Sequence, residues 1–293
     1  MFLILFSLNA FSQEYGVVLA GGGGKGAYQV GVWKALTEYG IAQKVTVISG
    51  TSVGGLNAAL FAGFPAADAE KIWLNQVSTK LTKDSSLISQ PGLSELLDSV
   101  SLEELYDSPV QVYVTAVQDR LKALKFIKSK LLGLPVGSYA HYFHINKDSK
   151  EDIKSKLLAT SAFPLICDSV FVNDGEGGHN YSDGGEESVG GDNIPIRPII
   201  ENYPNIKNII VIYLSDVNHV SRRISAKDYD NVNLIELFPS IDIDGNSFFE
   251  SIIDGTANFT DSRINLLIQK GYDDTVEYFQ RKKIFPVSGY WFE

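Results

Sequence analysis

The sequence lacks several features that mark common functional classes. It holds one cysteine, Cys167, so neither an intramolecular disulfide nor a cysteine-based zinc site can form. Basic residues are outnumbered, 25 Lys and Arg against 35 Asp and Glu, and the formal net charge is -10. This balance argues against nucleic acid as a partner, because phosphate binding needs a basic footprint. Repeats and low-complexity tracts are absent, and the composition is otherwise that of a globular chain with a full-sized core.

Long apolar runs are also missing, apart from the N-terminus. Residues 1–11 are nearly all apolar, and Ala10 and Ser12 occupy the -3 and -1 positions for a cut before Gln13. This pattern predicts a secretory signal peptide over residues 1–12 and export to the periplasm or the cell exterior. No Lys or Arg precedes the run, so the alternative is a buried strand of a cytoplasmic protein. The run is too short for a typical membrane-spanning helix.

Strand-like and helix-like patterns alternate along the rest of the chain. A strand at 15–20 leads through a glycine run into a helix at about 26–39 that Gly40 should end, and a strand at 45–49 leads through a tight turn into a helix at 56–62. The polar residues 216–233 are expected to form a surface connection. The alternation predicts an α/β protein with a parallel sheet. Further strands are expected at 110–117, 169–172, 180–182 and 206–214, and further helices within 66–107, 153–161 and 246–282.

The glycine run at 21–26, Gly-Gly-Gly-Gly-Lys-Gly, fits the spacing G-x-G-x-x-G, which also marks dinucleotide-binding turns. A dinucleotide site expects an acidic residue at the end of the second strand, where this chain has Ser49 and Gly50. A P-loop expects Ser or Thr after its lysine, whereas Lys25 precedes Gly26. The backbone N–H groups of such a run, beside a helix N-terminus, favour a negative charge. An oxyanion needs that arrangement.

The segment at 50–54, Gly-Thr-Ser-Val-Gly, matches G-x-S-x-G, in which a serine nucleophile stands on a sharp strand-to-helix turn. Small residues on both sides let the turn close and leave the Ser52 hydroxyl exposed. An apolar strand before the motif and an alanine-rich helix after it are the expected context. A serine that only caps the helix has the same local sequence, so the motif by itself leaves both interpretations open.

A serine nucleophile needs a base, and the sequence offers two candidates. The order Ser52, Asp183, His219 suits a Ser-His-Asp triad, although His219 lies in a polar stretch expected at the surface. The other candidate base is Asp183 itself, which ends an expected strand and precedes two glycines. Asp-Gly pairs are common in turns and recur at 174, 244 and 254, so this pair alone has little weight.

Together these segments resemble the patatin-like phospholipases, whose pattern is G-G-G-x-[KR]-G, then G-x-S-x-G, then D-G-[GA]. The motifs occur in this order at 21–26, 50–54 and 183–185. Residues 159–164, Ala-Thr-Ser-Ala-Phe-Pro, and 193–195, Asn-Ile-Pro, resemble two softer features of the family. The resemblance extends over about residues 15–198. Residues 186–192 depart from it, because they are longer and more acidic than the family's loop.

The resemblance implies a three-layer α/β/α patatin-like fold with a central, mostly parallel sheet. It implies Ser52 as nucleophile and Asp183 as its general base in a Ser–Asp dyad, with His179 as a bystander or as a residue that tunes Asp183. Substrates would be phospholipids or other lipid esters, and no metal or cofactor is implied. The oxyanion hole would be the backbone amides of Gly22, Gly23 and Gly24 with Lys25 near its rim, and the other motif positions are Gly21, Gly26, Gly50, Gly54, Gly184 and Gly185.

We therefore predict a lipid acyl hydrolase of phospholipase A or lysophospholipase type that works through an acyl-enzyme. A signal segment at 1–13 would precede a catalytic domain at 14–200, and residues 201–293 would add a strand and helices to the same domain. Two alternatives stay open: a Ser-His-Asp carboxylesterase acting on soluble esters, and a nucleotide-binding module that uses the glycine run. Peripheral membrane contact is a further expectation, from a basic amphipathic stretch that would otherwise face the core: Arg120, Lys122, Lys125, Lys128 and Lys130.

Overall fold

The computed structural model describes residues 14–82, 88–119, 140–164, 166–185, 187, 190–244 and 256–287. The expected signal peptide at 1–12 and the basic stretch at 120–132 lie outside the described residues. Within the described ranges, no helix combines the length and the apolar character needed to cross a bilayer.

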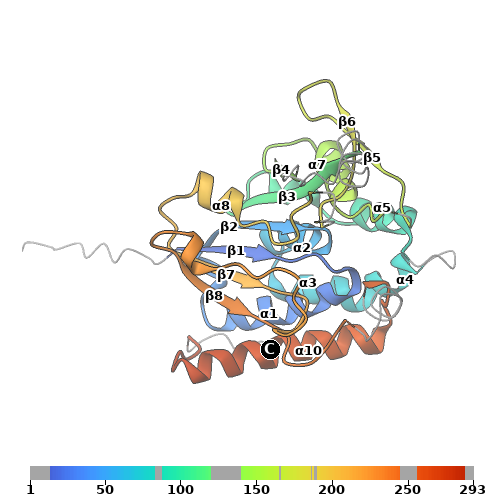
Figure 1. Cartoon of the computed structure of the whole chain (residues 1–293). Helices are drawn as coiled ribbons and strands as arrows, with labels where there is room; N and C mark the ends of the chain where they lie inside the picture. Colours follow the sequence, from blue (N-terminus) through green and yellow to red (C-terminus); the bar gives the residue numbers. More distant parts are fainter. Residues whose placement is uncertain are drawn as a thin grey trace, which may run out of the picture.

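An eight-stranded sheet forms the centre of the described part of the chain (Figure 1). Hydrogen-bonded pairs connect the strands along the path β5-β6-β3-β2-β1-β7-β8; β4 pairs with one edge of β3, and β2 and β6 share the other edge. The five strands β3, β2, β1, β7 and β8 are parallel to one another. Strands β4 and β6 run antiparallel to β3, and β5 runs antiparallel to β6. The sheet is thus mostly parallel, as predicted. The strands are β1 (Tyr15–Leu19), β2 (Val45–Thr51), β3 (Gln111–Gln118), β4 (Ala140–His144), β5 (Val170–Val172), β6 (His179–Asp183), β7 (Asn208–Ile212) and β8 (Asn233–Leu237).

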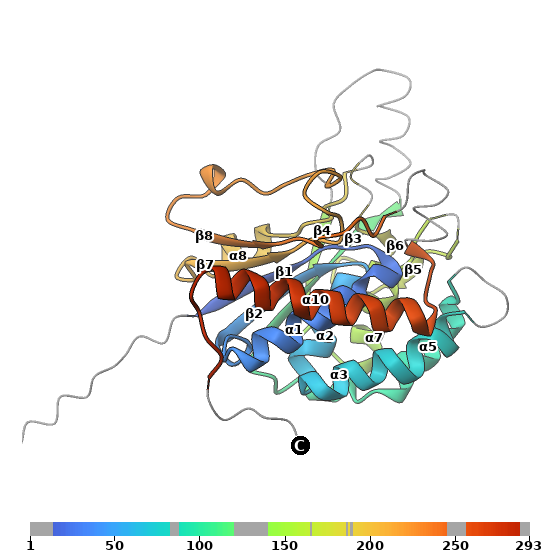
Figure 2. The same ribbon diagram turned by 90° about the horizontal axis from the view of Figure 1, so that it is seen from below.

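Helices flank the sheet on both faces, which gives the three predicted layers (Figure 2). Parallel strands connect through right-handed crossovers. Helices α1 and α2 precede β2 and β3, which follow one another on one side of β1, so both helices lie on one face. Helix α8 follows the antiparallel strand β6, and its Ile199 packs at Gly16 of β1 on the opposite face (Figure 2). Helix α10 packs along α1. The helices are α1 (Ala27–Glu38), α2 (Val53–Gly63), α3 (Ala66–Ile72), α4 (Ser78–Leu81), α5 (Gln90–Ser99), α7 (Lys150–Thr160), α8 (Arg197–Asn202) and α10 (Asp261–Arg281).

Shorter helical segments join these elements. The 3-10 turns are η1 (Gly23–Gly26), η2 (Ala42–Lys44), η5 (Leu102–Leu105) and η7 (Ala226–Asp228), and the π-helical turn η3 (Trp73–Val77) continues α3 into α4. The central strands are covered on both faces: residues 17–19 and 209–212 are fully buried. That is why they read as continuous apolar runs and not as alternating ones. Gly40 ends α1 as predicted, with φ of 66° and its N–H donated to the Thr37 carbonyl.

Some boundaries differ from the sequence-based expectation. Strands β4 and β8 were not predicted, because the five residues Ala-His-Tyr-Phe-His show no regular apolar–polar alternation and β8 follows a long polar stretch. Helix α2 begins at Val53 and not at 56, directly after the serine turn. Of the helical pattern predicted from 246 to 282, the described part is helix α10 from Asp261 to Arg281; before it, the Asn258 side chain accepts the N–H of Thr260. Residues 245–255 lie outside the described ranges.

Candidate active site

Ser52 stands on the turn that joins β2 to α2. Its backbone has φ of 55° and ψ of -128°, a conformation that costs energy for any residue with a side chain. The turn closes so tightly that a methyl group added to Gly50 would lie 2.1 Å from the Gly54 carbonyl oxygen. One added to Gly54 would lie 2.3 Å from the Leu19 carbonyl oxygen in β1. The predicted need for small residues on both sides of Ser52 is therefore confirmed as a steric requirement of the turn.

Thr160, the last residue of α7, holds this turn from outside. Its hydroxyl accepts the backbone N–H of Ser52 at 2.9 Å and donates to the Thr115 carbonyl of β3 at 2.5 Å. The residue is fully buried. The Ser52 amide therefore has a fixed acceptor inside the protein, which stabilises the strained backbone. The segment 159–164 resembles a feature of the family in the sequence, but no role could be predicted for Thr160.

Asp183 ends β6, and the register of the sheet fixes its position relative to β2. Along β3, Thr115 pairs with Thr51 of β2 on one edge and with β4 on the other. The next residue, Ala116, pairs with Asp183 of β6 and again with β4. A strand has only two edges, so β2 and β6 meet end to end along the same edge of β3. Ser52 and Asp183 thus stand at the facing ends of two strands that run toward each other.

Asp192 ties these two strand ends together. The Thr51 hydroxyl donates to the Asp192 carbonyl at 2.7 Å, and the Asp192 N–H donates to the Gly184 carbonyl at 2.7 Å. One backbone unit thus bonds to the neighbour of Ser52 and to the neighbour of Asp183. The Asp183 carboxylate is buried, and its Oδ1 accepts the N–H of Gly185 at 2.7 Å. This amide orients the carboxylate in a fixed direction.

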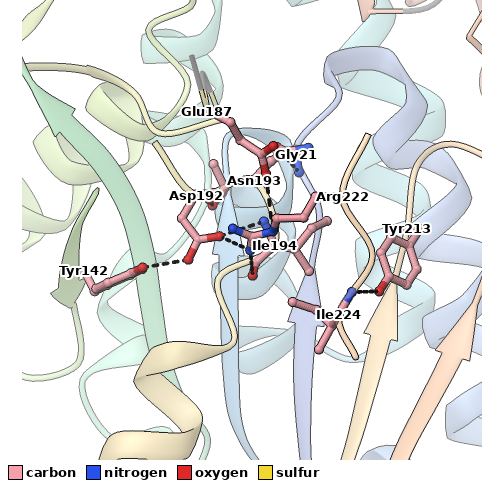
Figure 3. Close-up of polar contacts among 10 residues, drawn as sticks. Gly21, Tyr142, Glu187, Asp192, Asn193, Ile194, Tyr213, Arg222 and Ile224 are labelled. Atoms are coloured by element: carbon pink, nitrogen blue, oxygen red, sulfur yellow. Dashed lines mark hydrogen bonds and ion pairs between the residues drawn. The ribbon is translucent and has the colours of Figure 1, made fainter. Parts of the chain in front are cut away.

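The glycine run passes directly against the serine. A methyl group added to Gly21 would lie 3.0 Å from Ser52 Cβ and 2.6 Å from the Asn193 side-chain oxygen. That oxygen accepts the N–H of Gly21 at 3.1 Å (Figure 3). Gly22 then precedes the 3-10 turn η1, which continues into α1. The first N–H groups of a helix have no partner within it, so the amides of this run can bind an anionic oxygen.

Lys25 does not project into solvent at the edge of this site. Its side chain is buried, and its Nζ forms an ion pair with Asp244, beyond β8. Its Cε lies 2.9 Å from the position of a methyl group added to Gly22. The aliphatic part of the lysine therefore packs on the glycine run, and the charge is directed to Asp244.

The histidines are engaged elsewhere. His219 Nδ1 lies 2.5 Å from Asp216 Oδ2, with its side chain 60% exposed, and His179 Nδ1 lies 2.5 Å from Asp174 Oδ2 in the β5–β6 turn. Ligand atoms of Asp216, His219 and Asp242 lie within 4.8 Å of one another, an arrangement common on protein surfaces without a metal ion. A Ser-His-Asp triad would need Asp183 to orient the imidazole of His219. In the structure, Asp216 orients it instead.

The single cysteine also lies near this site. Burial raises the pKa of the Cys167 thiol more than a backbone hydrogen bond with Phe163 lowers it, and the carboxylates of Asp183 and Asp168 add smaller upward effects. A thiol with a raised pKa stays protonated at neutral pH and is a poor nucleophile. Cys167 is therefore not an activated thiol.

An apolar cavity opens beside Ser52. It encloses about 930 Å³, counting its open mouth, and its wall is almost entirely hydrophobic side chains from α2, α5 and the α3–α4 region. The polar positions on its wall include Ser52, Gly23 and Ser161; the apolar ones include Leu56, Leu60, Phe64, Leu93 and Leu97. The cavity therefore offers an apolar ligand access to the serine.

The comparisons with known proteins concern the family and the fold of this chain. The sequence profile of patatin-like phospholipases matches residues 17–200. Two proteins named lysophospholipase nte1, from Aspergillus terreus and Aspergillus niger, are each 55% identical to this chain over 50 residues, 17% of this chain but only 3% of theirs. Among solved structures, VipD from Legionella pneumophila aligns over 92% of this chain and 67% of its own, with TM-score 0.53 and 14% identity. At that identity the likeness shows the fold alone.

Proposed function

Because this chain belongs to the patatin-like phospholipase family, we propose that it is a lipid acyl hydrolase of the phospholipase A or lysophospholipase type. One observation carries the proposal: Ser52 on its strained turn and the buried Asp183 end two strands that meet along one edge of β3. An apolar cavity opens beside the serine. A hydroxyl, a carboxylate and an apolar cavity together suit the ester of a long acyl chain.

In the proposed reaction, the Asp183 carboxylate takes the proton of the Ser52 hydroxyl as Oγ attacks the ester carbonyl carbon. The backbone N–H groups of Gly22, Gly23 and Gly24 stabilise the negative charge on the carbonyl oxygen. When the tetrahedral intermediate collapses, Asp183 returns the proton to the leaving alcohol and the acyl group stays on Ser52. Water then attacks the acyl-enzyme, and its proton passes through Asp183 to Ser52 Oγ as the fatty acid leaves.

The cavity is proposed to hold the acyl chain of the substrate. Leu56 and Leu60 follow Ser52 along α2 at one-turn intervals, and Leu93 and Leu97 of α5 line the same cavity. An acyl chain bound there has its carbonyl at the serine and its methylenes among these side chains. The name lysophospholipase of the two fungal relatives supports single-chain phospholipids among the substrates.

Active-site labelling and lipid hydrolysis test the dyad. Folded wild-type protein should react with a fluorescent fluorophosphonate at Ser52 and hydrolyse lysophosphatidylcholine. Ser52→Ala should abolish labelling, and Asp183→Asn should lower kcat by about 10²–10⁴-fold, the usual contribution of a general base. Ser161→Ala is a matched control, because this second serine also lines the cavity and its hydroxyl donates to the Leu157 and Leu158 carbonyls of its own helix. No labelling of folded wild type, or full activity of Asp183→Asn, contradicts the proposal.

Chain-length preference tests the role of the cavity. Leu60→Trp adds bulk to the wall two turns after Ser52, so it should lower activity on long-chain lysophospholipids far more than on a butanoyl ester. Leu74→Trp is the control, because Leu74 is also half-buried against the core but does not line the cavity. If Leu60→Trp lowers activity on long-chain and butanoyl substrates equally, as Leu74→Trp should, the acyl chain does not bind in this cavity.

A further inference from the structure

The dipeptide Asp192-Asn193 touches every segment of the proposed catalytic machinery. The Asp192 backbone bonds to Thr51 before the serine and to Gly184 after the aspartate, each at 2.7 Å. The Asn193 side chain accepts the N–H of Gly21 at the start of the glycine run. The relative placement of serine, carboxylate and glycine run therefore depends on where this dipeptide is held.

A buried carboxylate fixes the dipeptide. The Asp192 side chain is only 5% exposed, and its Oδ2 accepts the Tyr142 hydroxyl of β4 at 2.6 Å. Its Oδ1 accepts the Ile194 N–H at 3.2 Å and Nη2 of Arg222 at 2.6 Å. Burial and this neighbouring carboxylate raise the pKa of Tyr142, so its hydroxyl remains a donor. A buried charge is costly unless a partner compensates it, and Arg222 is the cation in contact with this one.

Arg222 bridges the loop that follows Asp183. Besides Asp192, its Nη2 donates to the Ile194 carbonyl at 3.0 Å, and its Nε lies 3.5 Å from Oε1 of Glu187, nearer the start of the loop. One planar guanidinium thus contacts the loop on both sides, which a lysine ammonium cannot reproduce.

The backbone that carries Arg222 is itself anchored. Arg222 lies in the connection between β7 and β8, and two residues later the Ile224 N–H donates to the Tyr213 hydroxyl at 3.0 Å (Figure 3). Both Tyr213 and Ile224 are buried. The guanidinium therefore extends from a fixed support on the sheet to the loop.

We propose that Arg222 is a positioning residue for the hydrolase reaction, which acts through Asp192 to hold the loop after Asp183 against Ser52 and the glycine run. This inference rests on the proposed function. Arg222 lines no part of the acyl cavity, so its removal should lower kcat and leave KM nearly unchanged. A displacement of about 1 Å in a catalytic group can cost about 10²-fold in rate, so a loss of about 10- to 100-fold in kcat is expected for Arg222→Ala.

The neighbouring arginine is a matched control. Arg223 pairs with Glu236 of β8 through two short contacts and has no hydrogen bond or ion pair with the described residues of the loop. Arg223→Ala also removes an arginine–carboxylate ion pair, one residue away. A solvent-exposed ion pair contributes little to stability, so kcat should stay within about twofold of wild type. Ethylguanidine added to Arg222→Ala should restore part of the kcat, whereas it should do nothing for Arg223→Ala. Arg222→Lys should fall between Arg222→Ala and wild type.

A double variant tests whether Arg222 acts through Asp192. Arg222→Ala combined with Asp192→Asn should have a kcat no lower than the worse single variant, because both changes remove the same contact. Multiplying losses would show that the two residues act separately and would overturn the inference. Equal kcat for Arg222→Ala and Arg223→Ala would also overturn it. If Arg222→Ala does not fold, the kcat of Arg222→Lys is compared with that of Arg223→Ala in its place. If wild-type protein fails to label at Ser52, the proposed function fails instead.

Discussion

Replacing Thr160 by valine tests how the serine turn is held. The Thr160 hydroxyl accepts the Ser52 N–H at 2.9 Å and donates to the Thr115 carbonyl at 2.5 Å, in a fully buried position. Valine has nearly the same shape, so it opens no cavity, but both backbone groups lose this partner. Each buried group without a partner costs about 1–3 kcal/mol, so Thr160→Val should lower the free energy of unfolding by about 2–6 kcal/mol.

Two measurements follow the effect. Equilibrium unfolding in urea, monitored by the fluorescence of the buried Trp33 and Trp73, gives the change in stability. The rate of fluorophosphonate labelling reports the turn itself. A backbone like that of Ser52 stores on the order of 1–3 kcal/mol of strain. Once its amide is released, the turn can relax and move Oγ away from Asp183, so labelling should slow as stability falls.

Thr160→Ser separates the hydroxyl from the methyl group. Serine keeps both hydrogen bonds and loses only the Cγ2 that packs at Gly55, so it should cost about 1 kcal/mol, the value of one buried methyl group. The reasoning is refuted if Thr160→Val unfolds within about 0.5 kcal/mol of wild type, the range of a neutral surface change. It is also refuted if Thr160→Ser is as unstable as Thr160→Val.

Two further predictions concern stability. Gly54→Ala should lower Tm sharply, because its methyl group would lie 2.3 Å from a β1 carbonyl, whereas Gly63→Ala in the same helix meets only ordinary contacts and should be tolerated; equal Tm values would contradict this. Burial alone would raise the pKa of Asp174, but hydrogen bonds from His179, Tyr181 and two amides lower it well below its usual value. The stability this carboxylate provides is present above its unfolded pKa of about 3.9 and is lost as pH falls toward the folded value, so Asp174→Asn should flatten the decline in urea midpoint below about pH 4.

Contacts between residues close together in the sequence could be predicted here, and contacts between residues far apart in the sequence could not. The serine turn and the glycine run could be predicted, because Gly50, Ser52 and Gly54 constrain one another within five residues of chain. The fold class followed from the alternation of strands and helices and is confirmed. The contacts that hold the site could not be predicted: Thr160 lies 108 positions from Ser52, and Arg222 lies 30 positions from Asp192. A hydrogen bond across such a separation leaves no periodic pattern in one sequence.

The end-to-end meeting of β2 and β6 along β3 has a consequence for thermal motion. Both strands are hydrogen-bonded to consecutive residues of one strand, Thr115 and Ala116. When the sheet bends or twists, β3 carries Ser52 and Asp183 in the same direction, so their separation fluctuates less than that of two groups on independent loops. The hairpin between β5 and β6 can then vary in length, or vibrate freely at its tip, while the spacing at its base is preserved.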